Sequence, residues 1–236
     1  MRCERASVVI IGASSSIGSA IVDRFRAGGS RLVATYCNNN RLQDCDDIRT
    51  LPLDLASDAS IERFVADLRG LVEHVDTTIV LSGLLFGKSL REYTMGEIDA
   101  TMAVNFTGQA KLMMRMLPMF RPGSHVILLS SISAQKGSYD PVYAAAKGAV
   151  LAFVKSMASA VAPDVRINAI APGLIKDSSM YCAMTPERRE WHRTQTPRKR
   201  LLERTDLADV IFDLSRDHWA HLNGACIDLN GGQYVR

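Results

Sequence analysis

The chain has 236 residues, of which 47% are hydrophobic and 22% charged, and its formal net charge is +3. This composition is typical of a globular protein with one domain, or at most two small ones. The charge is too small to argue for nucleic acid, and no stretch of about 18 apolar residues predicts a membrane-spanning helix. We therefore expect neither a nucleic acid nor a membrane among its partners.

The cysteines bear on the redox state of the cellular compartment, and the histidines on metal binding. The five cysteines are scattered and form no CxxC pair, which is typical of a reduced protein with free thiols. The five histidines form no metal-ligand pattern, so we expect no metal site. The apolar stretch Val8–Ile11 is too short for a signal peptide. Together these features predict a cytoplasmic protein.

Strand and helix patterns alternate along the first half of the chain. We expect a buried strand at 7–11, a helix at 17–27 and a strand at 32–36. The polar segment 41–48 has room for about two turns of helix, and a third strand ends near 53–54. A helix from 57 or 58 to 69 and a strand at 78–81 follow.

The second half continues the alternation. Thr94, with Glu97 at capping-box spacing, opens a long helix to about 120. We then expect a strand at 126–129, a helix from 141 or 142 to 161, a strand at 166–170, a helix at 206–215 and a strand at 225–229. This order predicts an α/β fold over 1–236: a single Rossmann-type doubly wound parallel sheet with helices on both faces. Ligands of such sheets bind at the carboxyl ends of the strands.

The loop after the first strand contains Gly12 and Gly18 with a serine-rich stretch between them. A glycine directly after a strand allows a tight turn, and a second one lets the following helix approach a ligand closely. The helix N-terminus then offers free N–H groups to a pyrophosphate. A serine-rich turn without a ligand is the alternative, and this segment alone leaves both open.

Tyr143 and Lys147 are four residues apart on a predicted helix, so their side chains share one face. A nearby ammonium lowers the pKa of a phenol from about 10, which makes it a usable acid or base near neutral pH. A chance surface pair is the alternative. Further features count against chance, namely Ser130-Ser131 at the end of a strand, Asn105 in the long helix and Pro172-Gly173 after the sixth strand.

With these features in this order, the chain resembles the short-chain dehydrogenase/reductase family over essentially its whole length. The family pattern T-G-x-x-x-G-x-G is matched at Gly12 and Gly18, whereas Ile11 replaces the threonine and Ser16 the middle glycine. The resemblance implies that Tyr143 is the general acid or base and that Lys147 lowers its pKa and binds the nicotinamide ribose. It also implies that Ser131, preferred to Ser130, binds the substrate carbonyl, and that Asn105 bends its helix and holds a water.

The resemblance also implies a set of cofactor-binding residues, which follow several different strands. They are Gly12, Ser14, Ser15, Ser16, Ile17, Gly18, Tyr36, Asn38, Arg41, Asp54, Leu55, Ser82, Gly83, Pro172, Gly173 and Ile175.

The chain also departs from the family pattern. The family's N-N-A-G after the fourth strand is Val80-Leu-Ser-Gly83 here, and its threonine after P-G-x-I is displaced to Asp177 or Ser178. Together with Ser16 and the short segment after the second strand, these departures leave room for a weakened enzyme or a non-catalytic cofactor-binding protein.

The end of the second strand bears on the choice of cofactor. Enzymes that prefer NAD carry an acidic residue there, which binds the ribose hydroxyls. This chain has no carboxylate until Asp44, and Arg41, Asn38 or Ser14 could bind a 2′-phosphate. We therefore favour NADP(H), with NAD(H) as the alternative.

A basic segment at about 176–204 corresponds to the family's variable substrate lid. Its cations are Arg188, Arg189, Arg193, Arg198, Lys199, Arg200 and Arg204. Either they form a solvated helix surface, or they dock an acidic partner or a phosphate-bearing substrate arm.

Within the family, the chain is most similar to 3-oxoacyl-[acyl-carrier-protein] reductases of fatty acid or polyketide biosynthesis. The resemblance implies reduction of a carbonyl to a secondary alcohol, with a small-molecule or acyl-thioester substrate, acyl carrier protein as a candidate partner, and a homotetramer or homodimer. An alcohol, sugar or steroid dehydrogenase, or a pathway-specific ketoreductase, is the alternative.

Overall fold

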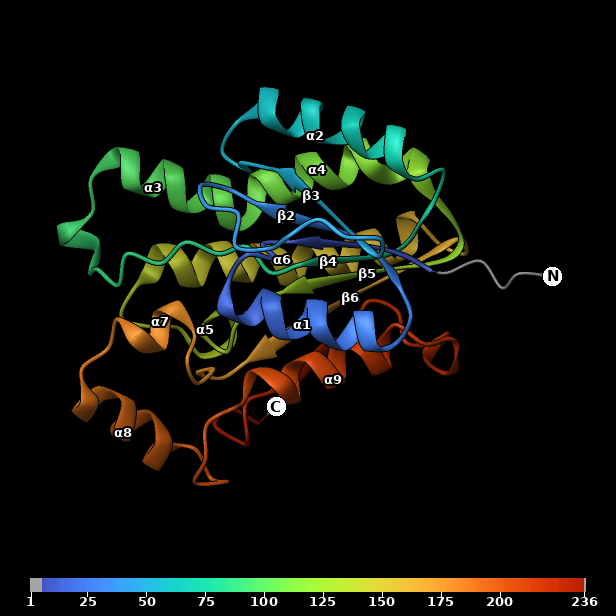
Figure 1. Cartoon of the computed structure of the whole chain (residues 1–236). Coiled ribbons are helices and arrows are strands. Elements are labelled where there is room, and N and C mark those ends of the chain that lie inside the picture. The colour runs from blue at the N-terminus through green and yellow to red at the C-terminus, as the bar shows by residue number, and fades with distance from the viewer. Residues whose placement is uncertain (1–5, 236) are drawn as a thin grey trace.

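The computed structural model describes residues 6–235, which form one seven-stranded parallel sheet (Figure 1). Its strands are β1 (Ser7–Ile11), β2 (Arg31–Tyr36), β3 (Ile48–Pro52), β4 (Val75–Val80), β5 (Phe120–Leu129), β6 (Val165–Pro172) and β7 (Cys226–Leu229). They lie in the order β3-β2-β1-β4-β5-β6-β7, which reverses between β1 and β4. The predicted fold class is confirmed, and the reversal marks where a ligand of such a sheet binds.

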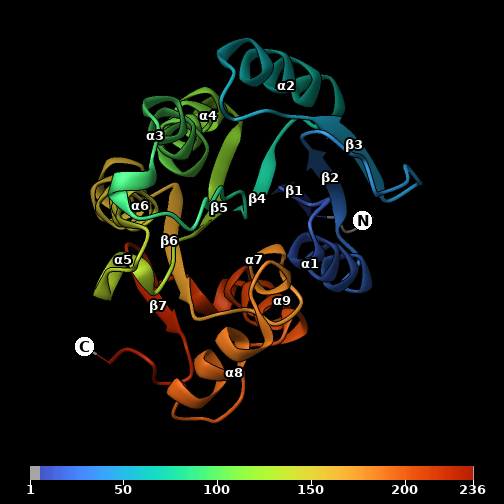
Figure 2. The same ribbon diagram turned by 90° about the vertical axis from the view of Figure 1, so that its left-hand side faces the viewer.

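Helices cover both faces of the sheet (Figure 2). One face carries α2 (Asp58–Leu71), α4 (Gly108–Met116) and α6 (Pro141–Ala160), and the other carries α1 (Ser16–Ala27) and α9 (Arg204–Leu214). Successive side chains of β1 alternate between the two layers: Val9 and Ile11 join the first, Val8 and Ile10 the second. Because both faces are covered, the central strands are almost continuous apolar runs.

Shorter elements connect these layers. They are η1 (Leu90–Glu92), α3 (Met95–Met102), η2 (Ala103–Thr107), η3 (Leu117–Met119), α5 (Ser133–Lys136), α7 (Ser179–Cys182), α8 (Pro186–Gln195) and η4 (Asp217–Trp219). The predicted lid therefore contains two helices, α7 and α8, whose bounds the sequence patterns did not indicate.

The long helix expected from Thr94 to about 120 is not continuous. Its start is as predicted, because Thr94 and Glu97 form a capping box. The π-helical turn η2 then interrupts it, and Phe120 already belongs to β5. The Asn105 side chain donates to the carbonyl of Thr101 at 2.9 Å and so engages a backbone acceptor within the helix, which is a common cause of such a bulge.

The two turns of helix expected within 41–48 are absent. Residues 41–47 are irregular, with a bend at 42, a turn at 46–47 and an isolated bridge between Cys45 and Ile48. Asp44 accepts hydrogen bonds from the backbone N–H and the hydroxyl of Thr50, which holds the loop without a helix. A polar segment of this length has too little apolar surface to bury a helix face.

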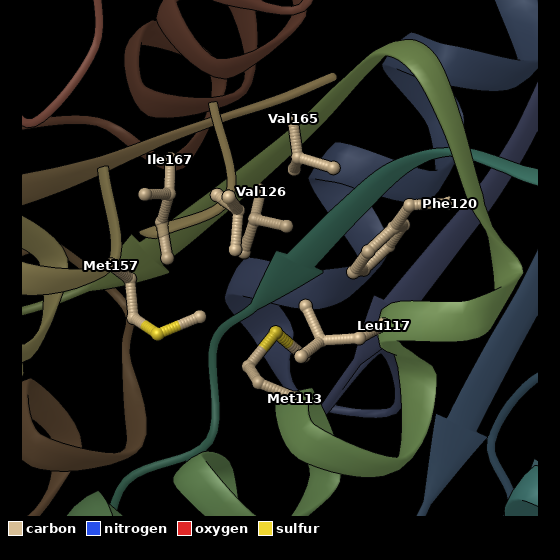
Figure 3. A pocket seen from close by; sticks show the side chains of 8 residues that line it. Met113, Leu117, Phe120, Val126, Met157, Val165 and Ile167 are labelled. Carbon is tan, nitrogen blue, oxygen red and sulfur yellow. The ribbon is translucent and has the colours of Figure 1, made fainter. Parts of the chain in front are cut away.

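An apolar hollow lies between the end of α4, the end of α6 and the starts of β5 and β6 (Figure 3). Its volume of about 10 Å³ barely holds one water molecule, and it sits at the amino ends of the strands, opposite the expected site. It is therefore no candidate for the substrate site. Among residues 6–235, no helix is both long and apolar enough to cross a membrane.

Candidate active site

The turn between β1 and α1 is built around two glycines. Gly12 has φ +85°, and its N–H donates to the hydroxyl of Thr35 on β2 at 3.0 Å. At Gly18 a Cβ would lie 2.5 Å from the Cα of Ala13, so no side chain fits there. The first glycine thus provides a left-handed turn, and the second lets α1 pack directly against the strand end.

Two of the three serines in this turn have engaged hydroxyls. Ser15 caps α1 by accepting from the N–H of Gly18 at 3.0 Å, and it donates to the carbonyl of Gly12. Ser16, at the position of the middle family glycine, donates to the carbonyl of Asp177 at 2.9 Å. The first turn of α1 contains no acidic residue, so its N-terminal dipole is not neutralised and the turn suits a pyrophosphate.

The edge after β2 and β3 is open. Asn38 and Arg41 are exposed, and Tyr36 is half-buried at the strand end. Burial and then the charge of Asp54 raise the pKa of Cys37, which places the Asp54 carboxylate near the end of β2. Leu55, next to Asp54, is buried against the sheet. The predicted cofactor-binding residues that follow β2 and β3 therefore lie at the ends of two neighbouring strands.

The segment after β4 connects the phosphate turn to the predicted catalytic residues. Ser82 lies beside Gly12, whose added Cβ would be 3.1 Å from the Ser82 hydroxyl. The Ser82 carbonyl accepts from the ammonium of Lys147 at 3.4 Å. A Cβ added to Gly83 would lie 3.3 Å from Oδ1 of Asn105 and 3.6 Å from Nζ of Lys147. Asn105 and Lys147 thus border the same small space.

Asn105 holds this segment through its side-chain amide. Its Oδ1 accepts from the N–H of Leu84 at 3.1 Å, and its Nδ2 donates to the carbonyl of Leu84 at 2.8 Å. The residue is fully buried in η2. Residues 81–89 form neither helix nor strand, so these two bonds help to hold the segment after β4 in place.

Tyr143 and Lys147 lie on α6 and are both buried, at 7% and 2% exposed. The Lys147 ammonium donates to the carbonyl of Leu129 at 2.8 Å and lies 6.0 Å from the Tyr143 ring centroid. Burial lowers the pKa of Lys147 to about 8. Burial also raises the pKa of Tyr143 to about 12, and a hydrogen bond with Ser131 opposes that rise.

The direction for Tyr143 is opposite to the sequence-based expectation that Lys147 lowers its pKa. Burial is the largest cause of this rise and Lys147 is not among the causes, since its ammonium donates to backbone carbonyls instead. Tyr143 is consequently a protonated phenol at neutral pH.

The two serines at the end of β5 have different surroundings. Ser130 is 2% exposed, and its hydroxyl donates to the carbonyl of Lys147 at 2.8 Å, within α6. Ser131 accepts from the N–H of Ser133 at 3.1 Å, and its hydroxyl opposes the rise in the pKa of Tyr143. Ser131 is therefore the serine that meets the phenol, while Ser130 fastens β5 to the catalytic helix.

The segment after β6 borders the same edge. Pro172 and Ile175 are buried, and the Gly173 N–H donates to the carbonyl of Leu229 at 3.1 Å. Asp177 and Ser178, the two candidates for the role of the displaced family threonine, have different surroundings. Ser178 is 5% exposed and its hydroxyl donates to the carbonyl of Ile175, whereas Asp177 is exposed with φ +58°. Ser178 thus caps α7 and has little capacity left for a ligand.

Comparison with known proteins places this arrangement in a family. The family model described as Enoyl-(Acyl carrier protein) reductase, a model of short-chain dehydrogenases/reductases, matches residues 12–233. The chain belongs to the short-chain dehydrogenase/reductase family. It is an oxidoreductase of the NAD(P)-dependent kind that this family comprises.

Relatives within the short-chain dehydrogenase/reductase family match over their full length. The chain is 27% identical to the 3-oxoacyl-[acyl-carrier-protein] reductase FabG of Escherichia coli (strain K12), with 100% of both chains covered. It is 28% identical to the uncharacterized short-chain type dehydrogenase/reductase y4mP of Sinorhizobium fredii (strain NBRC 101917 / NGR234), with 97% of both covered.

Among solved structures, one from Brucella melitensis is described as Short-chain dehydrogenase/reductase SDR:Glucose/ribitol dehydrogenase. It has a TM-score of 0.93 and 29% identity, and the match covers 99% of this chain and 98% of that one.

The lid of this short-chain dehydrogenase/reductase contacts the rest of the domain at its base, and its outer part is exposed. Ile175 and Leu202 form a parallel bridge, and Arg204 donates to the carbonyl of Ser16 at 3.2 Å. Helix α8 has no buried residue, and Trp191 on it is 53% exposed. A hollow of about 220 Å³, lined in part by Gly173 and Arg198, lies at the base of the lid.

The sequence patterns missed several residues that build the site. Thr35 fixes Gly12 with its hydroxyl, and the Leu129 carbonyl holds the Lys147 ammonium. Asp140 caps α6 by accepting from the N–H of Tyr143 at 2.9 Å. An aspartate directly before a proline at the start of a helix is a capping signal that could have been found. A backbone carbonyl as partner leaves no such signal.

Proposed function

We propose that the protein is an NADP(H)-dependent ketoreductase that reduces a carbonyl to a secondary alcohol, with 3-oxoacyl thioesters as its substrate class. The observation that carries this proposal is the meeting of Ser131 and Tyr143 on the carboxyl edge of the sheet, with Lys147 behind them and the phosphate turn beside them. The similarity to 3-oxoacyl-[acyl-carrier-protein] reductases of 27% over the full length supports the substrate class.

The chain's own side chains then have distinct roles. A phenol with a pKa of about 12 keeps its proton at neutral pH, which suits Tyr143 to donate it to a carbonyl oxygen. The Ser131 hydroxyl would orient that oxygen, and Lys147 would bind the nicotinamide ribose. Bound NADPH supplies the hydride that the carbonyl carbon receives. Asn105 keeps the segment after β4 in place beside Lys147.

The cofactor is held, in this proposal, by the turn from Gly12 to Gly18 and by the open edge after β2. The preference for NADP(H) rests on Arg41, which is exposed at that edge, and on Asp44, whose carboxylate is engaged with Thr50. Arg41→Ala should raise the KM for NADPH by about tenfold and leave the KM for NADH unchanged, as expected for one lost phosphate contact. An equal effect on both cofactors would rule out phosphate recognition by Arg41.

The thioester substrate is supported by the cations of the lid. Arg188 and Arg198 are exposed on or beside α8, while Arg193 is paired with Glu190. A phosphopantetheine arm and an acidic carrier protein are both anionic, and exposed arginines attract such partners at long range. The lid is therefore the proposed docking surface for the substrate arm.

The first test is the loss of 340 nm absorbance with NADPH, and separately with NADH, on an acetoacetyl thioester. Saturable turnover with NADPH that vanishes in Tyr143→Phe would support the proposal. NADPH binding without turnover would redirect the search to other ketones. Absence of both turnover and binding would refute an enzymatic function and favour a non-catalytic protein.

A sugar dehydrogenase is the second candidate. It is favoured by the likeness to the Brucella melitensis structure, whose description includes glucose/ribitol dehydrogenase. Oxidation of aldoses or polyols with NADP+ or NAD+, measured as a gain of 340 nm absorbance, separates the two candidates. A kcat/KM for a sugar above that for the acetoacetyl thioester would replace the first proposal.

We also propose a homotetramer or homodimer, assembled through the helices that carry Asn105 and Tyr143 and through the last strand. Phe106 of η2 and Phe153 of α6 stack edge to face while remaining partly exposed, which suits an interface. Light scattering after size exclusion measures the mass, and a monomer would refute the assembly.

A further inference from the structure

Asp140 is a carboxylate in an unusually buried position. It precedes Pro141 at the start of α6 and is 3% exposed. One of its oxygens, Oδ1, accepts from the N–H of Tyr143 at 2.9 Å. Aspartate is seldom buried to this extent unless its oxygens are fully hydrogen-bonded.

The remaining acceptors of Asp140 are used by a different part of the chain. The hydroxyl of Tyr93 donates to the carboxylate at 2.7 Å from Oδ2, and the N–H of Gly87 donates to Oδ2 at 2.9 Å. Both donors belong to residues 82–93, the segment between β4 and α3 that we call the β4–α3 segment. One carboxylate thus joins this segment to the first turn of the catalytic helix.

The β4–α3 segment depends on hydrogen bonds from side chains such as Asp140, because most of it has no regular secondary structure. Residues 81–89 form neither helix nor strand. Asn105 holds the segment at Leu84, and Asp140 holds it at Gly87 and Tyr93. The first fastening orients the part beside Lys147, and the second orients the part beside the start of α6.

We infer that Asp140 is a positioning residue, which fixes the β4–α3 segment against the N-terminus of α6 and places a negative charge next to Tyr143. This inference rests on the proposed role of Tyr143 as the acid of the reaction. Gly87 and Tyr93 donate to the same carboxylate that accepts from the N–H of Tyr143, so this carboxylate couples the β4–α3 segment to the first turn of α6.

The charge of Asp140 has a direction of effect on Tyr143. A nearby carboxylate disfavours the phenolate, so it contributes to the raised pKa of Tyr143, after burial. Removing that charge should lower the pKa of Tyr143. The phenol then loses its proton at a lower pH, and the alkaline limb of the reduction rate moves to lower pH.

The other ionisable groups near Asp140 each have hydrogen-bond or ion-pair partners. Lys147 donates to the carbonyl of Leu129 in the sheet, and Tyr93 is a half-buried phenol whose pKa is raised to about 12 by desolvation and by its hydrogen bond with Asp140. Around them, Lys88 pairs with Glu97 at 2.5 Å, and Glu92 hydrogen-bonds Ser89 and Tyr139 at the surface.

The test compares Asp140→Asn with Tyr93→Phe and with the control Glu92→Gln. Asparagine has one acceptor oxygen and no charge, so Asp140→Asn loses part of the fastening and the negative charge together. Tyr93→Phe loses a donor but keeps the charge. Glu92→Gln removes a charge of the same sign from an exposed carboxylate of the same segment.

Two readouts are needed. The first is hydrogen exchange measured by mass spectrometry on the purified full-length chain. The amides of residues 83–93 should exchange about tenfold faster in Asp140→Asn and several-fold faster in Tyr93→Phe than in the wild type. In Glu92→Gln the exchange rates of residues 83–88 should be unchanged. In the pH profile of kcat for reduction, the alkaline limb should move down by about one pH unit in Asp140→Asn and not move down in the other two.

The outcomes separate the inference from the proposed function. If exchange at residues 83–93 is unchanged in both Asp140→Asn and Tyr93→Phe, the fastening is refuted whatever the enzyme does. A pH profile in which Asp140→Asn and Glu92→Gln behave alike refutes the specific charge effect. If Tyr143→Phe retains turnover, the proposed function fails, whereas the exchange result still decides whether Asp140 fixes the segment. Should Asp140→Asn fail to fold, Tyr93→Phe alone decides the fastening.

Discussion

We call Asn105, Tyr143, Lys147 and the β4–α3 segment the wall of the candidate site. The wall and the lid lie at the same carboxyl edge of the sheet, yet they are held in opposite ways. In the wall, Asn105, Tyr143 and Lys147 are buried, and each polar atom of the Asn105 amide meets a backbone partner. In the lid, α8 has no buried residue and its contacts are mainly local. The position of the wall is thus determined by the core, while the lid is anchored chiefly at its base.

This difference in burial predicts which substitutions change the chemistry and which change substrate binding. Buried groups have strongly shifted pKa values because desolvation penalises their charged forms, as for Lys147 and Tyr143. The lid arginines are exposed, and in the proposed function they attract anionic substrates at long range. Substitutions in the wall should therefore change chemistry and stability strongly, whereas substitutions in the lid should change substrate binding weakly.

The largest effect is expected for Tyr143→Phe, which keeps the ring in its buried site but removes the proton donor. We expect kcat for reduction to fall by about 10³-fold, within the range for loss of general acid catalysis. The assay at 340 nm measures it, and NADPH fluorescence should show an unchanged Kd. Residual activity within tenfold of the wild type would contradict the assignment of the acid.

Lys147→Met should change how stability depends on pH. The pKa of Lys147 is lowered from 10.5 to about 8 by burial, so between these values the unfolded chain binds one more proton than the folded one. Stability of the wild type relative to the variant should be constant below about pH 8 and rise by about 3 kcal/mol up to pH 10.5. Urea unfolding at pH 7.5, 9 and 10.5 measures this difference, and parallel curves would contradict a buried, titrating lysine.

Asn105→Ala tests the hydrogen bonds that hold the wall. It removes both bonds to Leu84 and the one to Thr101, and we expect a loss of about 2 kcal/mol in the free energy of unfolding. Urea unfolding gives the value, and kcat should fall because the segment beside Lys147 loses its fastening. A stable, fully active variant would show that the π-helical turn positions the wall without the amide.

The smallest effect is expected in the lid. Arg188→Gln removes an exposed cation from α8, so the free energy of unfolding should change by less than about 0.5 kcal/mol. The KM for an acyl-carrier-protein-linked substrate should rise by about two- to threefold, with kcat unchanged and the effect lost at high salt. A loss of kcat comparable to that of Asn105→Ala would contradict the prediction that lid substitutions change substrate binding and not the chemistry.

Much of the fold was predictable because its signals are local. Strand β1 has the predicted bounds of 7–11, and Thr94 begins its helix by the expected capping box. The spacing of Tyr143 and Lys147 placed them on one helix face without any knowledge of the sheet. Failures occurred where a polar side chain replaced regular hydrogen bonding, as Asn105 does in η2 and Asp44 does in the loop before β3.

The amino-acid sequence by itself determined the alternation of strands and helices, the glycine turn after β1 and the placement of Tyr143 and Lys147 on one helix face, because apolar periodicity and glycine positions act over a few residues. The tertiary structure decided which serine meets Tyr143, where the Lys147 ammonium is directed and what fastens the β4–α3 segment. Those outcomes depend on residues far apart in the chain and on burial, which shifts a pKa through desolvation that no local pattern records.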